Sequence, residues 1–266
     1  MIKLLAVDMD GTCLNSKSQM SEKTVSALRL AAEKGITVVP TTGRNLSCIP
    51  HRLKNEKFYR YAITSNGACV NDLKENKKIY ESLISDKTAI EILKKCHKNG
   101  FGITAQIDGN YYLQGKLLSH AGRLYYGKDS KNSICIKNIE QFVDSHKKDV
   151  EEIQLYFLGT KAKETAKNIL SEFDTVSAAY SSIYVEIFDK NASKGTALSK
   201  LAEHLEINKE EIVCIGDAEN DLTMFASSGT RFAMGNAVES LKEKADFILP
   251  DNNSDGVAFA IENYIL

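Results

Sequence analysis

The stretch Leu4-Leu5-Ala6-Val7-Asp8-Met9-Asp10-Gly11-Thr12 lies close to the start of this chain. The apolar run from Ile2 to Val7 is short and continuous, which predicts a strand buried on both faces. Two aspartates and a glycine follow it directly. Ligands bind beyond the carboxyl ends of the strands in open α/β sheets, so Asp8 and Asp10 are candidates for a functional site. The alternative is an ordinary turn, because Asp and Gly are common after any strand.

Strands and helices alternate in the first and last parts of the chain, whereas the middle of the chain has another pattern. A helix capped by Ser21 and ending at Lys34 separates the first strand from strands predicted at 36–39 and 61–64. Strands and helices at this spacing form parallel sheets with right-handed crossovers. The last part of the chain shows the same alternation of strands and helices. Helices are predicted at 194–205 and from 220, 239 and 256, and strands at 212–215, 231–234 and 247–249. We therefore expect an α/β core with a parallel sheet.

The order of the elements predicted in the middle region indicates an α+β insert. Two apolar segments, 101–107 and 111–113, flank the turn-forming sequence Asp108-Gly109-Asn110 and predict a hairpin. Helices are predicted at 86–98, 139–146 and 161–173, and further strands at 153–158, 175–180 and 183–188. An antiparallel sheet covered on one face by helices accounts for this order. The predicted domains are a core of residues 1–81 and 189–266 and an insert of residues 82–188.

Composition narrows the class of protein. The 266 residues are 43% hydrophobic and 26% charged, with a net charge of −1. These values are typical of a globular protein and give no basic patch for nucleic acid or a membrane surface. The apolar start is too short for a signal peptide, and the six scattered cysteines lack the spacing of a zinc site. We expect a cytoplasmic protein with reduced thiols and with neither nucleic-acid nor membrane partners.

A second acidic group strengthens the functional interpretation of the first. Asp217 and Asp221 follow the strand predicted at 212–215, so they should reach the same sheet edge as Asp8. Two unit charges about 4 Å apart repel by about 4 kcal/mol at the effective dielectric of a protein surface. A hard divalent cation removes this repulsion, and oxygen ligands favour Mg²⁺. The same residues could also simply cap the helix predicted from 220.

Two further segments could bind an anion. Thr42 and Gly43 follow the second strand and are expected to open a helix, whose backbone amides would face a negatively charged ligand. Lys194 lies in the first turn of a predicted helix, where a lysine is unfavourable for the helix dipole. This placement indicates a role in holding a phosphate or a carboxylate. An exposed, solvated lysine is the alternative.

Taken together, these residues resemble the haloacid dehalogenase superfamily. Its four motifs are matched in order by residues 8–12, Thr42, Lys194 and residues 216–221. The match is closer to the Cof-type phosphatases with a type IIB cap, on Thr41-Thr42-Gly43-Arg44, Ser65-Asn66-Gly67-Ala68, Ser193-Lys194-Gly195, Gly216-Asp217-Ala218-Glu219-Asn220-Asp221, Ala233-Met234-Gly235-Asn236-Ala237 and Asp255-Gly256-Val257-Ala258. The resemblance implies a Rossmann-like, doubly wound parallel-sheet core with an inserted α+β cap domain. It covers both core segments, whereas the insert matches by position and size.

The resemblance also implies a role for each motif residue. Asp8 would be the nucleophile and Asp10 the general acid and base of a phosphatase. Mg²⁺ would be held by Asp8, the backbone carbonyl of Asp10, and Asp217. Phosphate would be bound by Met9, Thr42, Gly43, Lys194 and Asn220. Asp221 would hold Lys194 or a metal-bound water, and Arg44 is a candidate contact for the rest of the substrate.

The expected reaction is Mg²⁺-dependent hydrolysis of a small phosphomonoester, such as a sugar phosphate, through an aspartyl-phosphate. The presence of Asp10 favours ester hydrolysis, because the ion-pumping ATPases and dehalogenases of the superfamily lack this aspartate. Alternatives are a phosphomannomutase-like phosphotransferase and a non-catalytic regulator that binds sugar phosphates. Six residues of the insert are further candidates for substrate contacts: Tyr111, Tyr112, His120, Arg123, Tyr184 and Glu186.

Overall fold

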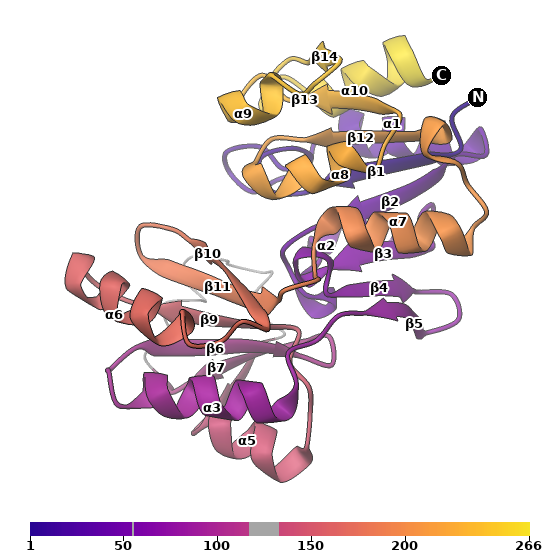
Figure 1. Ribbon diagram of the computed structural model, residues 1–266. Coiled ribbons are helices and arrows are strands. Elements are labelled where there is room, and N and C mark those ends of the chain that lie inside the picture. Colours follow the sequence, from indigo (N-terminus) through magenta and orange to yellow (C-terminus); the bar gives the residue numbers. More distant parts are fainter. Residues whose placement is uncertain (55, 117–132) are drawn as a thin grey trace. The chain divides into compact units, whose positions relative to one another are not determined.

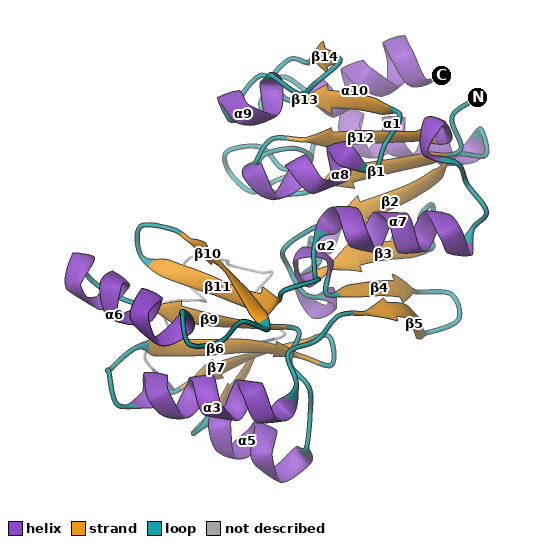
Figure 2. Cartoon of the chain, in the orientation of Figure 1, coloured by secondary structure: helices purple, strands orange, loops and turns teal. Residues whose placement is uncertain are grey.

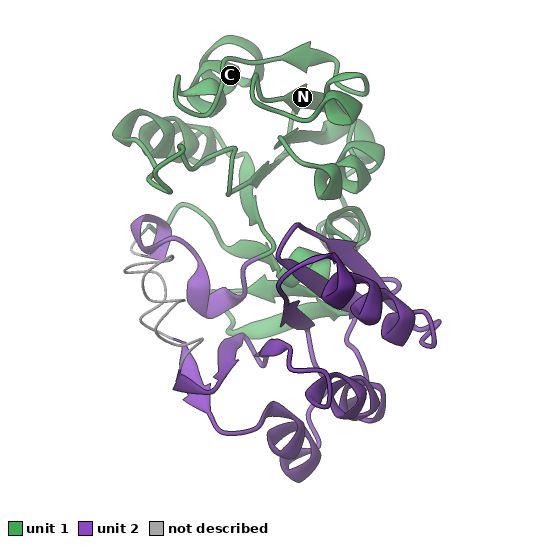
Figure 3. Cartoon of the chain, turned by 90° about the vertical axis from the view of Figure 1, so that its left-hand side faces the viewer, with its two compact units in different colours: residues 1–43, 55–81, 193–266 green, residues 44–54, 82–192 purple. Residues whose placement is uncertain are grey.

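A computed structural model describes residues 1–54, 56–116 and 133–266. The chain forms two compact units, shown in different colours in Figure 3. Unit 1 holds residues 1–43, 55–81 and 193–266, and unit 2 holds residues 44–54 and 82–192. None of the helices in the described part of the chain is long and apolar enough to cross a membrane.

Unit 1 is built on an eight-stranded sheet with the order β14-β13-β12-β1-β2-β3-β4-β5 (Figure 1). The strands from β14 to β3 run parallel, and β4 and β5 add an antiparallel edge. The bounds are β1 (Leu4–Asp8), β2 (Thr37–Thr41), β3 (Tyr61–Thr64), β4 (Cys69–Asp72), β5 (Lys77–Glu81), β12 (Ile212–Gly216), β13 (Thr230–Ala233) and β14 (Phe247–Ile248). The central strand β1 is buried along its whole length, as its continuous apolar run predicts.

Helices cover both faces of this sheet (Figure 2). Helix α7 packs with α8 on one face, and α1 packs with α10 on the other. The bounds are α1 (Glu22–Glu33), α7 (Lys194–His204), α8 (Leu222–Ala226), α9 (Glu239–Lys242) and α10 (Gly256–Ala260). Ser21 caps α1 by accepting a hydrogen bond from the backbone N–H of Thr24, as predicted from the sequence. The fold class is therefore the doubly wound α/β core that the sequence predicts.

Unit 2 is an α+β layer structure. Its six-stranded sheet has the order β10-β11-β9-β6-β7-β8, and every pair is antiparallel except β7 with β8. The helices α3, α5 and α6 bury one face of the sheet in a single apolar core. The bounds are β6 (Gly102–Ile107), β7 (Asn110–Gln114), β8 (Ile134–Ile136), β9 (Glu152–Tyr156), β10 (Val176–Tyr180), β11 (Tyr184–Asp189), α2 (His51–Lys54), α3 (Asp86–His97), α5 (Ile139–His146) and α6 (Thr160–Leu170).

Local structure after β2 differs from the expectation. Strand β2 continues through Pro40 to Thr41, and no helix begins directly after Gly43. The next helical segment is a three-residue 3₁₀ turn at Leu46–Cys48, which Asn45 caps. The prediction of a helix that opens at Thr42 and Gly43 was therefore wrong. The helical turn starts later because Asn45 has a side chain that can cap it: Asn45 Oδ1 accepts a hydrogen bond from the Cys48 N–H at 3.0 Å.

Candidate active site

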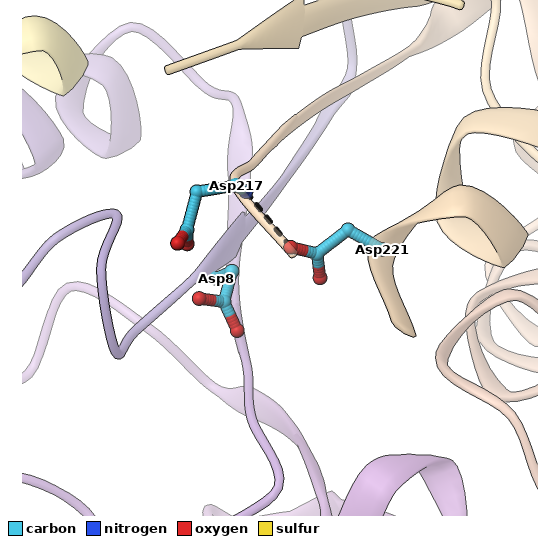
Figure 4. A group of neighbouring side chains, drawn as sticks. All are labelled: Asp8, Asp217 and Asp221. Atoms are coloured by element: carbon cyan, nitrogen blue, oxygen red, sulfur yellow. Dashed lines mark hydrogen bonds between the residues drawn. The ribbon is translucent and has the colours of Figure 1, made fainter. Parts of the chain in front are cut away.

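The acidic side chains of the candidate site lie together at the ends of the central strands of unit 1. Strands β1 and β12 are neighbours in register, with Val7 opposite Ile215, so Asp8 and Asp217 emerge at the same edge. Carboxylate oxygens of Asp8, Asp217 and Asp221 lie within 4.8 Å of one another. Figure 4 shows the three side chains converging from β1 and from the loop after β12. This is the acidic cluster that the sequence predicts.

A buried lysine joins two of these carboxylates. Lys194 begins helix α7, whose N-cap Ser193 accepts a hydrogen bond from the Thr196 N–H. Its ammonium donates to Asp8 Oδ1 and to Asp221 Oδ1, both at 2.6 Å. Burial by itself would lower the pKa of Lys194, but the charges of Asp221 and Asp8 outweigh burial and raise the pKa. The lysine is therefore a permanent cation at the centre of the cluster.

The second oxygen of Asp221 shapes the loop that carries Asp217. Asp221 Oδ2 accepts hydrogen bonds from the backbone N–H groups of Asp217 and Ala218, at 2.9 and 3.0 Å. Both oxygens of this fully buried carboxylate thus have donors within the protein. The contact with Lys194 is one of the two roles expected for Asp221, whereas its contacts with the Asp217 loop were not predicted.

The cluster has an excess of negative charge. Burial, reinforced by the neighbouring carboxylates, raises the pKa of Asp8 and raises that of Asp217 to about 6. Three carboxylates face one ammonium among the described residues of the cluster, so a divalent cation would offset the repulsion that remains. An all-oxygen donor set matches Mg²⁺ rather than the softer metals. These residues therefore fit the metal that the sequence suggests.

The loop after β1 is fitted closely around Asp217. Gly11 has a φ of +82°, and a Cβ at this position would lie 2.2 Å from Asp217 Oδ2. Only glycine meets both demands. The next residue, Thr12, donates its hydroxyl to Asp217 Oδ1 at 2.6 Å. By contrast, the side chain of Asp10 is exposed, which leaves its carboxyl accessible to a ligand in solution.

The residues predicted to bind phosphate lie along the same edge of unit 1. Asp8 is opposite Thr41 in the sheet register, which places Met9 and Thr42 at neighbouring strand ends. Thr42 is buried, and its backbone N–H donates to Ile63 O at 3.0 Å. Asn220 extends from the loop after β12 and donates its Nδ2 to Asn66 Oδ1 at 3.0 Å. Met9 and Thr42 therefore lie at strand ends next to Asp8, and Asn220 is tied to the turn that carries Asn66.

The remaining candidates belong to unit 2. Arg44 Nη1 donates to the backbone oxygen of Cys48 at 3.3 Å, within the segment 44–54. Tyr111 donates its hydroxyl to Gln154 Oε1 at 2.7 Å on the sheet of this unit. Tyr112 packs against the apolar core and therefore has a structural part. His120 and Arg123 lie outside the described residues.

Two contacts of the site were not predicted from the sequence. The family resemblance includes Thr12 in the first motif and gives it no role, yet Thr12 donates a hydrogen bond to Asp217. The resemblance likewise includes Asn66 without a role, yet Asn66 contacts Asn220, 154 residues away. The only available signal for Thr12 was a hydroxyl next to the Asp-x-Asp-Gly sequence. The signal for Asn66 was its place before glycine, where asparagine tolerates a left-handed backbone.

Comparison with known proteins identifies the family. The family model described as haloacid dehalogenase-like hydrolase matches residues 5–261. A 5-amino-6-(5-phospho-D-ribitylamino)uracil phosphatase of Bacillus subtilis is 29% identical over 265 residues, which cover 100% of this chain and 96% of the relative. A crystal structure from Thermotoga maritima is 30% identical, with a TM-score of 0.85 over 98% of this chain and 97% of the other.

One more solved structure shares the fold of this chain. A sugar phosphatase of haloacid dehalogenase subclass IIB has a TM-score of 0.82 over 98% of each chain, at 22% identity, and so shares the fold. The family match extends over both core segments and the insert, and the acidic cluster is formed by residues of the first and fourth motifs. The chain therefore belongs to the haloacid dehalogenase-like hydrolases and is a phosphatase of that family.

Proposed function

We propose that this protein hydrolyses small phosphomonoesters with Mg²⁺, through a phosphoryl group carried on Asp8. The observation that carries the proposal is the position of Lys194, whose buried ammonium lies 2.6 Å from both Asp8 and Asp221. A buried cation beside a carboxylate stabilises the charge of an anion that arrives there. Asp217, within the same 4.8 Å cluster, completes the acidic set.

The first chemical step uses two side chains. An oxygen of Asp8 attacks phosphorus, forming the aspartyl-phosphate bond while the bond from phosphorus to the ester oxygen breaks. The exposed carboxyl of Asp10 donates its proton to the departing alkoxide. Lys194 and the amides of Met9 and Gly43 hold the phosphoryl oxygens, together with Thr42 and Asn220. These groups keep the phosphorus in line with Asp8.

The second step returns the enzyme to its starting state. The Asp10 carboxylate takes a proton from a water molecule, whose oxygen attacks phosphorus and releases inorganic phosphate from Asp8. Asp10 thereby regains the proton that it gave to the leaving group, so the cycle balances. Asp8, the Asp10 backbone carbonyl and Asp217 would hold Mg²⁺. When bound, the metal ion neutralises charge on the phosphoryl group and orients it.

The name of one relative supports a proposal for the substrate class. The Bacillus subtilis relative is named for a phosphorylated ribitylamino compound, which supports a small phosphorylated metabolite as substrate here. Sugar phosphates are of the same chemical class. We further propose that the insert, residues 82–188, acts as a cap that contributes contacts to the part of the substrate beyond the phosphate. Arg44, which lies outside the insert on the segment 44–54, is a separate candidate for such a contact.

The experiment that tests this function is a phosphate-release assay. Purified protein is incubated with a panel of sugar phosphates, nucleotides and phosphorylated cofactors, with Mg²⁺ or with a chelator. We expect release of inorganic phosphate from several members in Mg²⁺ and none with the chelator. Interconversion of two sugar phosphates without phosphate release would instead indicate a mutase. Binding without either reaction would indicate a regulator.

A further inference from the structure

The turn between β3 and β4 has an unusual backbone. Ser65, Asn66 and Gly67 have φ values of 53°, 54° and 94°, and all three residues are buried in unit 1. Residues other than glycine avoid this left-handed region because Cβ meets the neighbouring carbonyl oxygen. Such conformations persist only where the surrounding structure holds them, and they cluster at functional sites. The contacts of this turn therefore show what it is held against.

Asn66 contacts three of the residues proposed to bind phosphate. Its backbone N–H donates to Thr42 O at 3.2 Å. Its Oδ1 accepts from Asn220 Nδ2 at 3.0 Å. A Cβ at Gly43 would lie 3.0 Å from that Oδ1 and 3.1 Å from Nδ2, so the amide of Asn66 covers the backbone of Gly43. One side chain thus joins the segments that follow β2 and β12.

The next residue of the turn reaches the third segment of the site. A Cβ at Gly67 would lie 2.1 Å from the carbonyl oxygen of Ser193 and 2.7 Å from the backbone nitrogen of Lys194. Only a glycine allows this approach, and its φ of 94° excludes other residues independently. The turn therefore packs directly against the start of α7, from which Lys194 extends to Asp8.

We propose that Asn66 is a positioning residue that orients Asn220 and Gly43 for phosphate binding. The proposal rests on the phosphatase function above and extends it. Asn220 is exposed, so its side chain would rotate freely in the absence of a partner. Its Nδ2 carries two hydrogens, and the bond to Asn66 Oδ1 uses one of them. The other is thereby directed before the phosphate arrives, which avoids an ordering cost during binding.

The test compares Asn66→Gly with Asn220→Ala and with the double variant. Glycine keeps the left-handed backbone at position 66 and deletes only the amide. The readouts are the dissociation constant of inorganic phosphate in Mg²⁺, by titration calorimetry, and kcat and KM for a phosphomonoester. We expect each single variant to raise the dissociation constant of phosphate about tenfold and to lower kcat/KM about tenfold. A change of this size corresponds to the loss of one hydrogen bond. The double variant should be no worse than the poorer single variant, because both remove the same interaction.

Asn71 supplies a matched control on the neighbouring strand β4. It is also a buried asparagine, and its Nδ2 donates to Thr64 Oγ1 at 3.0 Å, away from the residues proposed to bind phosphate. We expect Asn71→Ala to lower the melting temperature while phosphate affinity and KM stay unchanged. A merely structural part for Asn66 would give the same result as this control. That result, or multiplicative losses in the double variant, would overturn the proposal.

The two proposals fail in different ways. An unmodified protein that binds inorganic phosphate but releases none from any ester would contradict the proposed function. Weaker phosphate binding by Asn66→Gly would still support the positioning role in that case. Conversely, Mg²⁺-dependent turnover with unchanged phosphate binding in Asn66→Gly would leave the phosphatase intact and overturn the positioning role alone.

Discussion

The ammonium of Lys194 lies 2.6 Å from Asp8 Oδ1, although 186 residues separate the two in the sequence. The lysine side chain is 1% exposed and that of Asp8 is 6% exposed. Removing one member of a buried ion pair leaves an uncompensated charge, which costs more than the pair contributes. Because Asp221 is held by the same ammonium, the lysine affects stability and chemistry together.

Replacing Lys194 by methionine should therefore destabilise unit 1 by about 3 kcal/mol near pH 8. Asp8 would then lack its cation, so its folded-state pKa, which burial already raises above the unfolded value, would rise further. A carboxyl with a raised pKa destabilises the fold above that pKa, and the loss shrinks as protonation proceeds at lower pH. Denaturant unfolding at pH 8 and pH 5.5 measures this, with a smaller loss expected at pH 5.5.

Lys200 gives the control on the same helix. It pairs with Glu203 at 2.9 Å on the surface, with half of its side chain exposed. Exposed pairs contribute little, so Lys200→Met should leave the free energy of unfolding nearly unchanged. Equal losses in the two variants, or a Lys194→Met loss that grows at low pH, would contradict the account.

Much of the core fold could be predicted because its signals are local. The apolar runs that became β1 and β12 are continuous, and Ser21 caps α1 through a contact three residues away. The hairpin of β4 and β5 was not predicted, because β5 has no buried residue and lacks apolar alternation. Strand β8 was not predicted either, because it is only three residues long and two of them are exposed.

The sequence predicts that the acidic residues of the cluster share one sheet edge, but it predicts only some of the contacts around them. Strand order places Asp8 and Asp217 at one edge, which parallel-sheet topology alone requires. The contact of Lys194 with Asp221 is implied by the family resemblance only as one of two alternatives. The contact of Asn66 with Asn220 depends on side-chain packing between distant segments, which no local pattern encodes.

Gly11→Ala should disable the metal site. The variant needs a left-handed backbone and places a Cβ 2.2 Å from Asp217 Oδ2, so Asp217 must move. We expect Mg²⁺-dependent turnover to fall more than tenfold, a loss of over 1.4 kcal/mol of transition-state stabilisation. Gly35 is the control, because its φ is +88° with no atom within 4 Å of an added Cβ. Gly35→Ala should lower stability by about 1 kcal/mol without affecting turnover. Equal activity in the two variants would refute this assignment.

The ion pair of Asp72 with Arg60 should make the free energy of unfolding depend on pH, independently of the active site. Its bidentate contact with Arg60, with bonds of 3.0 and 2.6 Å, lowers the pKa of Asp72 to about 2. A lowered pKa contributes stability above the unfolded value of 3.8, and this contribution is lost as pH falls toward about 2. Since Arg60 is 40% exposed, we expect about 1 kcal/mol. Urea unfolding at pH 5 and pH 3 should show a smaller decrease for Asp72→Asn than for the unmodified protein. Parallel decreases would exclude this pair as the cause.

Asp10→Asn should separate the two chemical steps. An aryl phosphate has a leaving group that departs without a proton, so the first step should survive in this variant. The second step lacks its base, and the phosphoryl group should stay on Asp8. Stopped-flow measurement with p-nitrophenyl phosphate should therefore show a burst of about one equivalent of p-nitrophenol per enzyme, followed by slow turnover. Steady turnover at the unmodified rate would show that Asp10 is not the base.

Detection of the aspartyl-phosphate is the most direct test of the proposed chemistry. Protein quenched in acid during turnover of a good substrate with Mg²⁺ is digested, and the peptide that contains Asp8 is examined by mass spectrometry. We predict the added mass of one phosphoryl group on Asp8, and its loss together with turnover in a folded Asp8→Asn variant. Turnover at an undiminished rate in Asp8→Asn, with no phosphoryl group on this peptide in the unmodified protein, would contradict the account.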